Sequence, residues 1–577
     1  SAANLQTPFP VSRVMKRQHL ETACAVFMLC LGMLAAATTI IGVVRHFSPV
    51  PFWDQWDGGV QFYMNALNDP VTAFFQQHNE HRLAFPKLFY FADIRYFGGR
   101  NVSLLIVNLL FALLVGIALY RVISRDLPER PAPRAIVAGT LLILAFSFVQ
   151  RENFNWGFQN QWFAIYLFAF CAFHSLERST DTRTGHASPW LAAALACATL
   201  ATISMASGLL VFPTLIAFGL YLRLPRTTLA TLIVATITAW ALYFHHWTSP
   251  GGASLTASMI QHPGGVLKFV ILYLGAPFHY ALPGRRALVL LCGCVLLGGA
   301  LLSIWIALTA TKRPRAVTLL AMSVFLIGNA IITAAGRYIF GLDAALSSRY
   351  TTSGLIAFAS VAFFLWLNLS RRIPRATVAV VLMLYVAVVA NGQKAVRESA
   401  HDEVYRKSIG GLALRSHVYD AAYTSALYPD PSVLRSTAQA AERSGLSIFA
   451  ADNTDYPPLS ERVQSDTACE GQIDIVKATE TPGVLAAHGW AFDSGLRRYA
   501  PSVLLTDATG RVLGQALTGE RRDDVAAALH TQDPYGGWLG FFKMPPDRRV
   551  RAFGVLAPGR YCALRGEIDV PAPVPSP

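Results

Sequence analysis

Residues 22–44 read TACAVFMLCLGMLAAATTIIGVV, an apolar stretch without a single charged side chain. A helix needs about 20 such residues to cross the hydrocarbon core of a bilayer. Ten further apolar runs follow, and the whole chain of 577 residues is 53% hydrophobic and only 14% charged. Soluble domains carry about 25% charged residues. The sequence therefore predicts a polytopic α-helical membrane protein with about eleven transmembrane helices.

The expected spans are residues 22–44 (an uncleaved signal anchor), 104–120, 135–148, 162–173, 190–204, 209–222, 229–243, 287–308, 317–332, 355–369 and 376–390.

The distribution of charge sets the expected orientation. Residues 1–390 hold 28 Lys and Arg against 12 Asp and Glu, whereas residues 391–577 hold 20 against 22. Because basic loops stay in the cytoplasm, segments 46–100, 151–161 and 336–350 are expected outside. Residues 264–282 are interpreted as a partly embedded helix of an outer loop. No basic stripe with interleaved aromatic residues indicates nucleic-acid binding.

The composition changes after the last apolar run. We expect a transmembrane domain over residues 1–391, a helical extracytoplasmic connector over 392–465, a β-sandwich over 466–570 and a disordered tail over 571–577. Short alternating runs separated by turn residues favour the sandwich.

Two cysteines bracket this β domain. Cys469 and Cys562 are a candidate disulfide of an oxidising compartment. The alternative is a pair of unlinked structural thiols.

Acidic residues concentrate in the first outer loop. Asp54 and Asp57 are three residues apart, so on a helix they share one face. Ionisable residues that flank a membrane and gather with other polar groups are functional candidates. The alternative is a short interfacial helix, anchored by Trp53 and Trp56 and capped by the two acids.

The same loop continues into His78-Asn79-Glu80-His81-Arg82, with Lys87 shortly after. We interpret these side chains as a substrate-binding wall in which Arg82 and Lys87 face a phosphate. A solvated loop is one alternative. A metal site with His78 and His81 as ligands is another, although two histidines at this spacing are a weak signal.

Two later outer loops supply further candidates. Segment 151–161 is dense in amides and aromatics, and Glu152, Asn155 and Gln159 are expected to bind sugar hydroxyls, unless the segment is only a capped turn.

Segment 336–350 places Arg337 and Arg349 outside, beside Tyr350. Cations there depart from the positive-inside trend and need an anionic partner. That partner is either a lipid-phosphate substrate or the lipid headgroups.

Together these features resemble the GT-C superfamily of integral-membrane glycosyltransferases, over roughly residues 1–390. Asp54 matches the position of the essential acid in the first outer loop of that superfamily, and Glu80 is a second acid in the loop. Lys87 is similar to a donor-phosphate contact of the lipid A-modifying members. The β domain is similar to carbohydrate-binding modules that some members append.

The resemblance implies transfer of a sugar from a polyprenyl-phosphate donor to a cell-envelope glycan or glycolipid acceptor. Asp54 or Asp57 would act as the base, and Arg337, Arg349 and Lys87 would stabilise the leaving phosphate. The site and the C-terminal domain would lie on the periplasmic side of a bacterial inner membrane. No cofactor is required, although a divalent cation is compatible with the chemistry.

Two other functions fit the same pattern. One is an O-antigen-type polysaccharide polymerase or ligase, which would use diphosphate-linked oligosaccharides. The other is a flippase or transporter of lipid-linked sugars without chemistry, for which polar residues at the bilayer midplane are expected.

Overall fold

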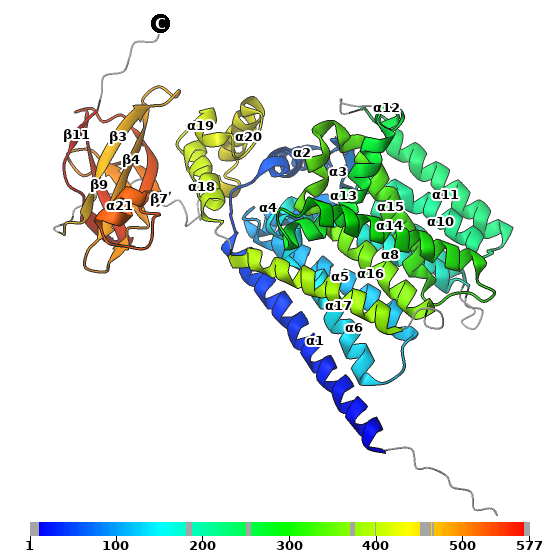
Figure 1. Ribbon diagram of the computed structural model, residues 1–577. Helices are drawn as coiled ribbons and strands as arrows, with labels where there is room; N and C mark the ends of the chain where they lie inside the picture. The colour runs from blue at the N-terminus through cyan, green and yellow to red at the C-terminus, as the bar shows by residue number, and fades with distance from the viewer. Residues whose placement is uncertain are drawn as a thin grey trace, which may run out of the picture. The chain divides into compact units, whose positions relative to one another are not determined.

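The computed structural model describes residues 11–180, 187–249, 255–369, 375–397, 400–450, 463, 465 and 467–570. The described chain is mostly helical and ends in a β-sheet domain (Figure 1). It divides into two compact units: residues 1–45, 74–88 and 104–398 form the first, and 46–73, 89–103 and 399–577 form the second. The expected disordered tail, 571–577, lies outside the described residues.

Seven helical segments of the described chain are long and apolar enough to cross a membrane. The first is Gln18–Arg45, within α1 (Val11–Arg45). The other six contain α5 (Val102–Arg125), α6 (Pro131–Ala145), α11 (Arg226–Phe244), α14 (Arg286–Thr309), α15 (Val317–Arg337) and α16 (Thr351–Asn368).

The other four expected spans coincide with helices that are shorter or less apolar. These are α8 (Asn160–Arg178), α9 (Ala187–Thr202), α10 (Val211–Tyr221) and α17 (Arg375–Asn391). Residues 264–282, interpreted as a partly embedded helix, form α13 (Pro263–Ala281), which packs against α14, α15 and α16. The structure therefore supports a membrane-embedded protein with seven spans by length and composition.

Glycines let neighbouring helices of the first unit approach closely. A Cβ on Gly139 of α6 would lie 2.3 Å from the carbonyl oxygen of Met28 in α1, and α1 and α6 run side by side in Figure 1. Gly275 of α13 and Gly293 of α14 are equally confined, each against a backbone carbonyl of the other helix. Small residues at such crossings are typical of helices that pack within lipid.

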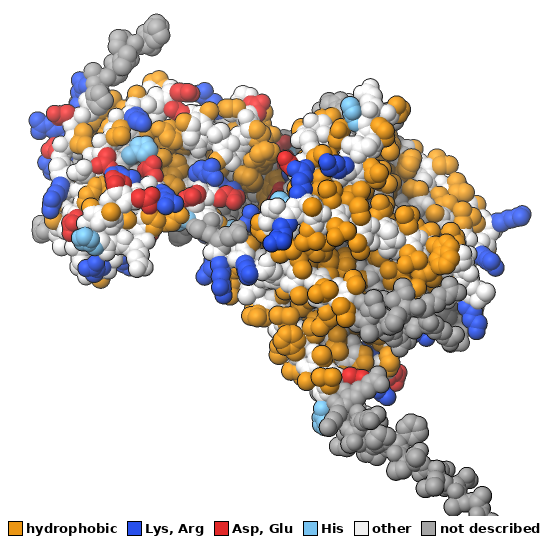
Figure 2. Space-filling view, in the orientation of Figure 1, with side chains coloured by type: hydrophobic (Ala, Val, Ile, Leu, Met, Phe, Trp, Pro, Cys, Tyr) orange, Lys and Arg blue, Asp and Glu red, His pale blue; other side chains and the backbone are white. Residues whose placement is uncertain are grey.

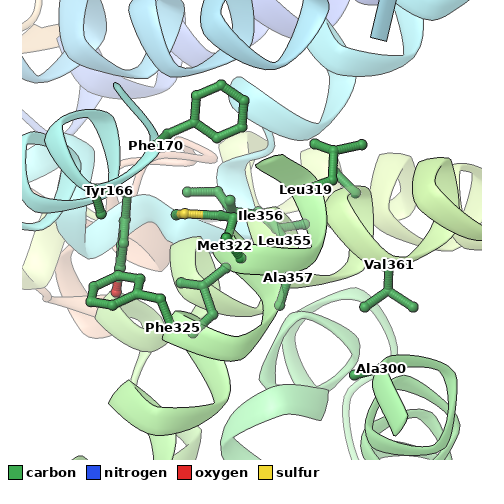
Figure 3. Close-up of a cluster of buried hydrophobic side chains, with 14 of the residues drawn as sticks. Tyr166, Phe170, Ala300, Leu319, Met322, Phe325, Leu355, Ile356, Ala357 and Val361 are labelled. Atoms are coloured by element: carbon green, nitrogen blue, oxygen red, sulfur yellow. The ribbon is translucent and has the colours of Figure 1, made fainter. Parts of the chain in front are cut away.

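Large apolar side chains fill the interior of this unit and also cover its surface. Tyr166 and Phe170 of α8 lie beside Met322 and Phe325 of α15 in the close-up of the core, and all four are buried (Figure 3). On the outside, Ile237 and Leu242 of α11 are 64% and 70% exposed. Figure 2 shows hydrophobic side chains over much of the visible face of these helices, as a lipid-facing surface requires.

The second unit combines residues 46–73 and 89–103 with the C-terminal third of the chain. Its helices include α2 (Phe62–Asn68), α18 (His401–Arg415), α19 (Ala421–Thr424) and α20 (Pro431–Arg443). One hydrophobic core joins Trp56 and Val60 of the loop to Leu412 and Leu434 of these helices, and to Phe541 of the sheet. Residues 46–73 thus group with the C-terminal part of the chain, although the sequence placed them in the transmembrane domain.

The β domain is one antiparallel sheet rather than two packed sheets. Its main path runs β10-β9-β6-β7-β8-β4-β3, with β5 paired to β4 and β11 paired to β9. Register shifts interrupt four of the strand pairs, and such bulges bend a sheet. The result is a half-barrel, which differs from the expected sandwich.

The strands are β3 (Glu470–Ala478), β4 (Val484–Asp493), β5 (Arg498–Tyr499), β6 (Ser502–Thr506), β7 (Val512–Glu520), β8 (Gly537–Lys543), β9 (Arg549–Ala557), β10 (Arg560–Ala563) and β11 (Ile568–Asp569).

The two cysteines that bracket the sheet are joined. Cys469 and Cys562 form a disulfide with a Cα–Cα distance of 5.3 Å across 93 residues of sequence. Both are buried in the core of the half-barrel, beside Val503 and Ala552.

Replacing both cysteines by serine should lower the free energy of unfolding of the second unit by about 4 kcal/mol, because a long loop loses its cross-link in the unfolded state. The loss would appear as a lower melting temperature of the β-sheet circular dichroism signal. Cys294→Ser is the control, because Cys294 is an exposed free thiol of α14. Equal melting of the double variant and the wild type would contradict the expectation.

Candidate functional site

The predicted site residues divide between the two units. Asp54 and Asp57 belong to the second unit, and the other candidates in the loops belong to the first. In the second unit, Asp54 lies in the 3-10 turn η1 (Trp53–Gln55) and Asp57 in the following π-helical turn η2 (Trp56–Gln61). Carboxylate oxygens of the two residues lie within 4.8 Å of each other.

Backbone and core contacts hold this acidic turn in place. Trp53 has a left-handed φ of 49°, and its N–H donates to the carbonyl oxygen of Leu427 at 2.7 Å. Trp56 is fully buried in the core of the unit. Lys407 of α18 places its ammonium 4.1 Å from the ring centroid of Phe52. Lys407 of α18 and Leu427, which lies between α19 and α20, thus hold the segment that carries the acid pair.

A network of hydrogen bonds holds the same turn in place. Gln55 donates through Nε2 to Oδ1 of Asn101 at 2.9 Å, and the N–H of Asn101 donates to Asp93. Asp93 also accepts from the hydroxyl of Ser103. Burial raises the pKa of Asp93. Because Asn101 and Asp93 have further hydrogen-bond partners of their own, this network restrains Gln55 and with it the backbone between the two acids.

Two phenols flank the acid pair. Tyr428, which follows α19, hydrogen-bonds the carboxylate of Asp57 through its hydroxyl. Burial and the negative charges of Asp57 and Asp54 raise the pKa of Tyr428 to about 12. Tyr90 of α4 (Ala84–Phe97) is buried, and burial together with the charge of Asp54 raises its pKa as well. Both phenols therefore stay protonated at neutral pH and are available as donors.

In the first unit, His78 to Arg82 form a short hairpin. Strand β1 (Gln77–His78) pairs with β2 (His81–Arg82), and Asn79 takes the left-handed conformation that the tight turn needs. Gln77 exchanges two hydrogen bonds with the backbone of Thr248, which ties the hairpin to the segment after α11.

Glu80 is the charged centre of this hairpin. Its carboxylate accepts from Nη2 of Arg337 at 2.7 Å and lies 3.6 Å from Nε2 of His81. The other ring nitrogen of His81 accepts from the N–H of Ala206 at 3.2 Å. Burial acts to raise the pKa of Glu80, but His81 and Arg337 outweigh it, so the pKa lies below its ordinary value.

Arg82 and Lys87, expected to face a phosphate, bind backbone carbonyls. Arg82 donates to the carbonyl oxygens of Phe75, Tyr243 and His245 at 2.5–2.7 Å. Lys87 is buried and donates to the carbonyl oxygens of Gln76 and Phe74 at 2.9 and 3.3 Å. Burial, and secondarily the charge of Arg82, lower the pKa of Lys87 to about 8. These contacts shape the loop.

A second ion pair joins segment 151–161 to segment 336–350. Nε of Arg349 lies 3.4 Å from Oε1 of Glu152, and its backbone N–H donates to Oε2 of the same carboxylate at 3.2 Å. The hydroxyl of Ser347 donates to that carboxylate at 3.0 Å. The guanidinium of Arg349 also lies 5.8 Å from the ring centroid of Tyr350.

The amide-rich segment buries polar atoms that lack partners. Among the described residues, the side-chain oxygens of Asn153, Asn155, Gln159 and Gln161 are buried without a hydrogen bond. Nδ2 of Asn153, in contrast, binds the carbonyl oxygen of Arg349 and the hydroxyl of Thr352. Buried acceptors without donors are rare, and they suit hydroxyl groups of a ligand or water.

Comparison of the chain with protein-family models, with curated proteins and with solved structures finds no match. The function is therefore inferred from the residues and their geometry.

Sequence reasoning missed Tyr90, Tyr428, Ser347 and Asn153. Tyr428 is far from Asp57 in sequence, and no local motif marks it. Ser347 and Asn153 lie within the segments 336–350 and 151–161 that the sequence singled out, so these two were detectable from the sequence.

Asp57→Asn should lower the pKa of Tyr428 from about 12 towards the ordinary phenol value near 10, because a negative charge beside the phenol disappears. NMR of tyrosine labelled at the ring Cζ would follow the titration in the full chain. The Tyr428→Phe spectrum assigns the signal, and Tyr423, which packs edge-on against Phe541, is the internal control. An unchanged titration of Tyr428 would refute the contact.

Glu80→Gln should lower the free energy of unfolding at pH 7 by about 0.5 kcal/mol, since both partners of the ion pair are more than 30% exposed. The pKa of Glu80 is depressed, so its stabilisation is present above the ordinary glutamate value near 4.3 and disappears as the pH falls through the folded-state value.

Thermal unfolding of the detergent-solubilised chain between pH 7 and pH 3 measures this difference. The wild type and Glu80→Gln should converge at acidic pH. A gap that persists at pH 3 would show that the glutamine acts through packing instead of charge.

Proposed function

We propose that this protein is a membrane glycosyltransferase of the GT-C type. It transfers a sugar from a polyprenyl-phosphate donor to a hydroxyl of a cell-envelope glycan or glycolipid. The observation that carries the proposal is the braced carboxylate pair Asp54 and Asp57, which lies outside the candidate spans and keeps its oxygens within 4.8 Å. A membrane protein that immobilises two acids outside its spans has the components of a general-base site.

In the proposed reaction, Asp54 or Asp57 accepts the proton of the acceptor hydroxyl. The acceptor oxygen forms a bond to the anomeric carbon, and the bond from that carbon to the phosphate oxygen breaks. The lipid phosphate leaves with the electron pair. This leaving group needs no strong acid, and the direct displacement inverts the anomeric configuration.

The resemblance to the GT-C superfamily implies that Arg337 and Arg349 of the first unit bind the donor phosphate. Arg337 uses Nη2 for Glu80, and Arg349 uses Nε for Glu152. The acceptor-rich amide segment, with Asn155 and Gln159, would receive hydrogen bonds from sugar hydroxyls. No cofactor is needed for these steps, and a divalent cation is compatible with them.

The proposal includes the membrane topology expected from the sequence. We infer eleven spans, with α8, α9, α10 and α17 completing the seven, and an extracytoplasmic second unit in a bacterial inner membrane. The disulfide Cys469–Cys562 supports this side of the membrane, because disulfides persist in oxidising compartments.

The test uses the full chain in nanodiscs and a panel of polyprenyl-phosphate sugars with radiolabelled sugar. Turnover would be measured as release of polyprenyl phosphate. Asp54→Asn should lower kcat about 100- to 10,000-fold, as removal of a general base does.

Asp69→Asn is the matched control. Asp69 is an exposed acid of the same loop whose carboxylate accepts from the N–H of Thr72, a capping role that asparagine fills equally well. Its turnover should equal that of the wild type.

Three outcomes would redirect the proposal. A product with a retained anomeric configuration would exclude direct displacement. Transfer of a whole oligosaccharide repeat from a diphosphate lipid would identify a polymerase or ligase. Movement of the lipid-linked sugar across the bilayer without turnover would identify a flippase.

A further inference from the structure

One face of the half-barrel carries a row of residues that crosses four adjacent strands. Gln472 of β3 is directly opposite Trp490 of β4, which is opposite Gly537 of β8, which is opposite Glu520 of β7. Residues directly opposite each other on paired strands point to the same face. With strands about 4.8 Å apart, the row is about 14 Å long.

A glycine in this row makes room for a cationic side chain. A Cβ on Gly537 would lie 2.7 Å from Cγ of Arg522, so the Arg522 side chain lies over this position. From there it reaches Asp474 of β3 at 2.6 Å and Asp524 at 2.7 Å. Gln472 donates to Asp474 at 2.9 Å. Arg522 thus spans the sheet from the end of β7 to β3.

A second polar pair lies next to the row. Nδ1 of His488 is 3.1 Å from the carboxylate of Glu520. Arg522 therefore has two carboxylate partners, and the imidazole of His488 has one. All these side chains are partly exposed: 20% for Asp474, 26% for Arg522, 23% for His488 and 39% for Glu520.

Aromatic side chains complete the surface. Trp490 is half-buried, although its neighbour Trp538 on the opposite face is fully buried in the core. Beyond β7, the ring of His401 lies 3.9 Å from that of Tyr535, and its Nε2 lies 2.9 Å from the carbonyl oxygen of Gly519. Figure 2 shows acidic and basic side chains interleaved over the unit that contains these strands.

We infer that this face, defined by Gln472, Asp474, His488, Trp490, Glu520 and Arg522, is a binding site for a neutral oligosaccharide. The ring of Trp490 offers an apolar plane for the C–H face of a sugar. The amide, carboxylate and guanidinium groups around it offer planar donors and acceptors that their mutual hydrogen bonds hold in place.

Charge decides between classes of ligand. A site for phosphate, nucleic acid or an acidic glycan needs cations that exceed the local carboxylates. Here the carboxylates match or outnumber the cations, which favours a ligand that brings hydroxyls and no charge. This inference is independent of the proposed glycosyl transfer, since it concerns binding to the sheet alone.

The experiment is a binding measurement on the full chain in nanodiscs by biolayer interferometry. The probes are immobilised hexasaccharides of neutral glucose (β1,4- and α1,4-linked) and mannose, with an oligogalacturonate of the same length as the acidic counterpart. The wild type should bind at least one neutral probe and should bind the oligogalacturonate more weakly.

Trp490→Ala should weaken binding of the neutral probe about tenfold, the loss expected for one aromatic stacking contact. Gln472 is exposed on the terminal strand β3, so Gln472→Ala should weaken binding of the neutral probe without a change in melting temperature. This second variant tests the site even if Trp490→Ala fails to fold.

Arg551→Gln is the matched control for Arg522→Gln. Arg551 lies on β9, in another part of the sheet, and it pairs with Glu567 at 3.2 Å. Arg522→Gln should weaken binding, and Arg551→Gln should not.

Absence of binding to every neutral probe would overturn the inference. So would binding of the oligogalacturonate alone, or equal affinities of the wild type, Trp490→Ala and Gln472→Ala. Loss of turnover in Asp54→Asn has no bearing on these results, so failure of the proposed catalytic function and failure of this site are separable.

Discussion

The second unit depends on the burial of Trp56. This residue lies between Asp54 and Asp57 in sequence, and its indole fills the core that α18, α20 and β8 form together. Truncation of a buried tryptophan costs about 3–5 kcal/mol, a large share of the stability of an ordinary domain. The same burial fixes the direction in which the neighbouring carboxylates of Asp54 and Asp57 point. The packing of Trp56 therefore also determines where the two acids lie. The hydrogen bond from the N–H of Trp53 to the carbonyl oxygen of Leu427 reinforces this position.

Among the candidate site residues of the first unit, two arginines follow a different rule, in which each charge already has a partner of opposite sign within the chain. Arg337 pairs with Glu80, and Arg349 pairs with Glu152. An anionic ligand would have to share each arginine with a carboxylate or displace it. Such sharing weakens binding of simple anions and favours a ligand that supplies further contacts, such as hydroxyls for the unsatisfied amides.

Local patterns in the sequence predicted much of the architecture. Apolar length marked the helices of the first unit, alternation marked the strands, and the spacing of Asp54 and Asp57 anticipated their proximity. No local pattern in the sequence indicates the long-range contacts. That Trp56 packs with Leu412, and that Tyr428 meets Asp57, follows from side-chain packing across hundreds of residues. A periodicity within a short window cannot encode it.

Two further differences have local causes that become visible only in three dimensions. Bulges such as the one between Ile473 and Ile475 bend one sheet into a half-barrel, whereas strand alternation alone fits a sandwich equally well. Arg82 and Lys87 bind carbonyls of their surroundings, and composition does not distinguish a cation that supports a loop from one that meets a ligand.

The shared core of the second unit also has a consequence for biosynthesis. The segment with Trp56 leaves the ribosome about 350 residues before Leu412, its packing partner in α18. At 5–20 residues per second, that interval is about 20–70 s. During it the acidic segment has no hydrophobic core to join. Synthesis of the last third of the chain thus becomes the step that assembles the acid pair, so a chain stopped early would carry the acids without their geometry.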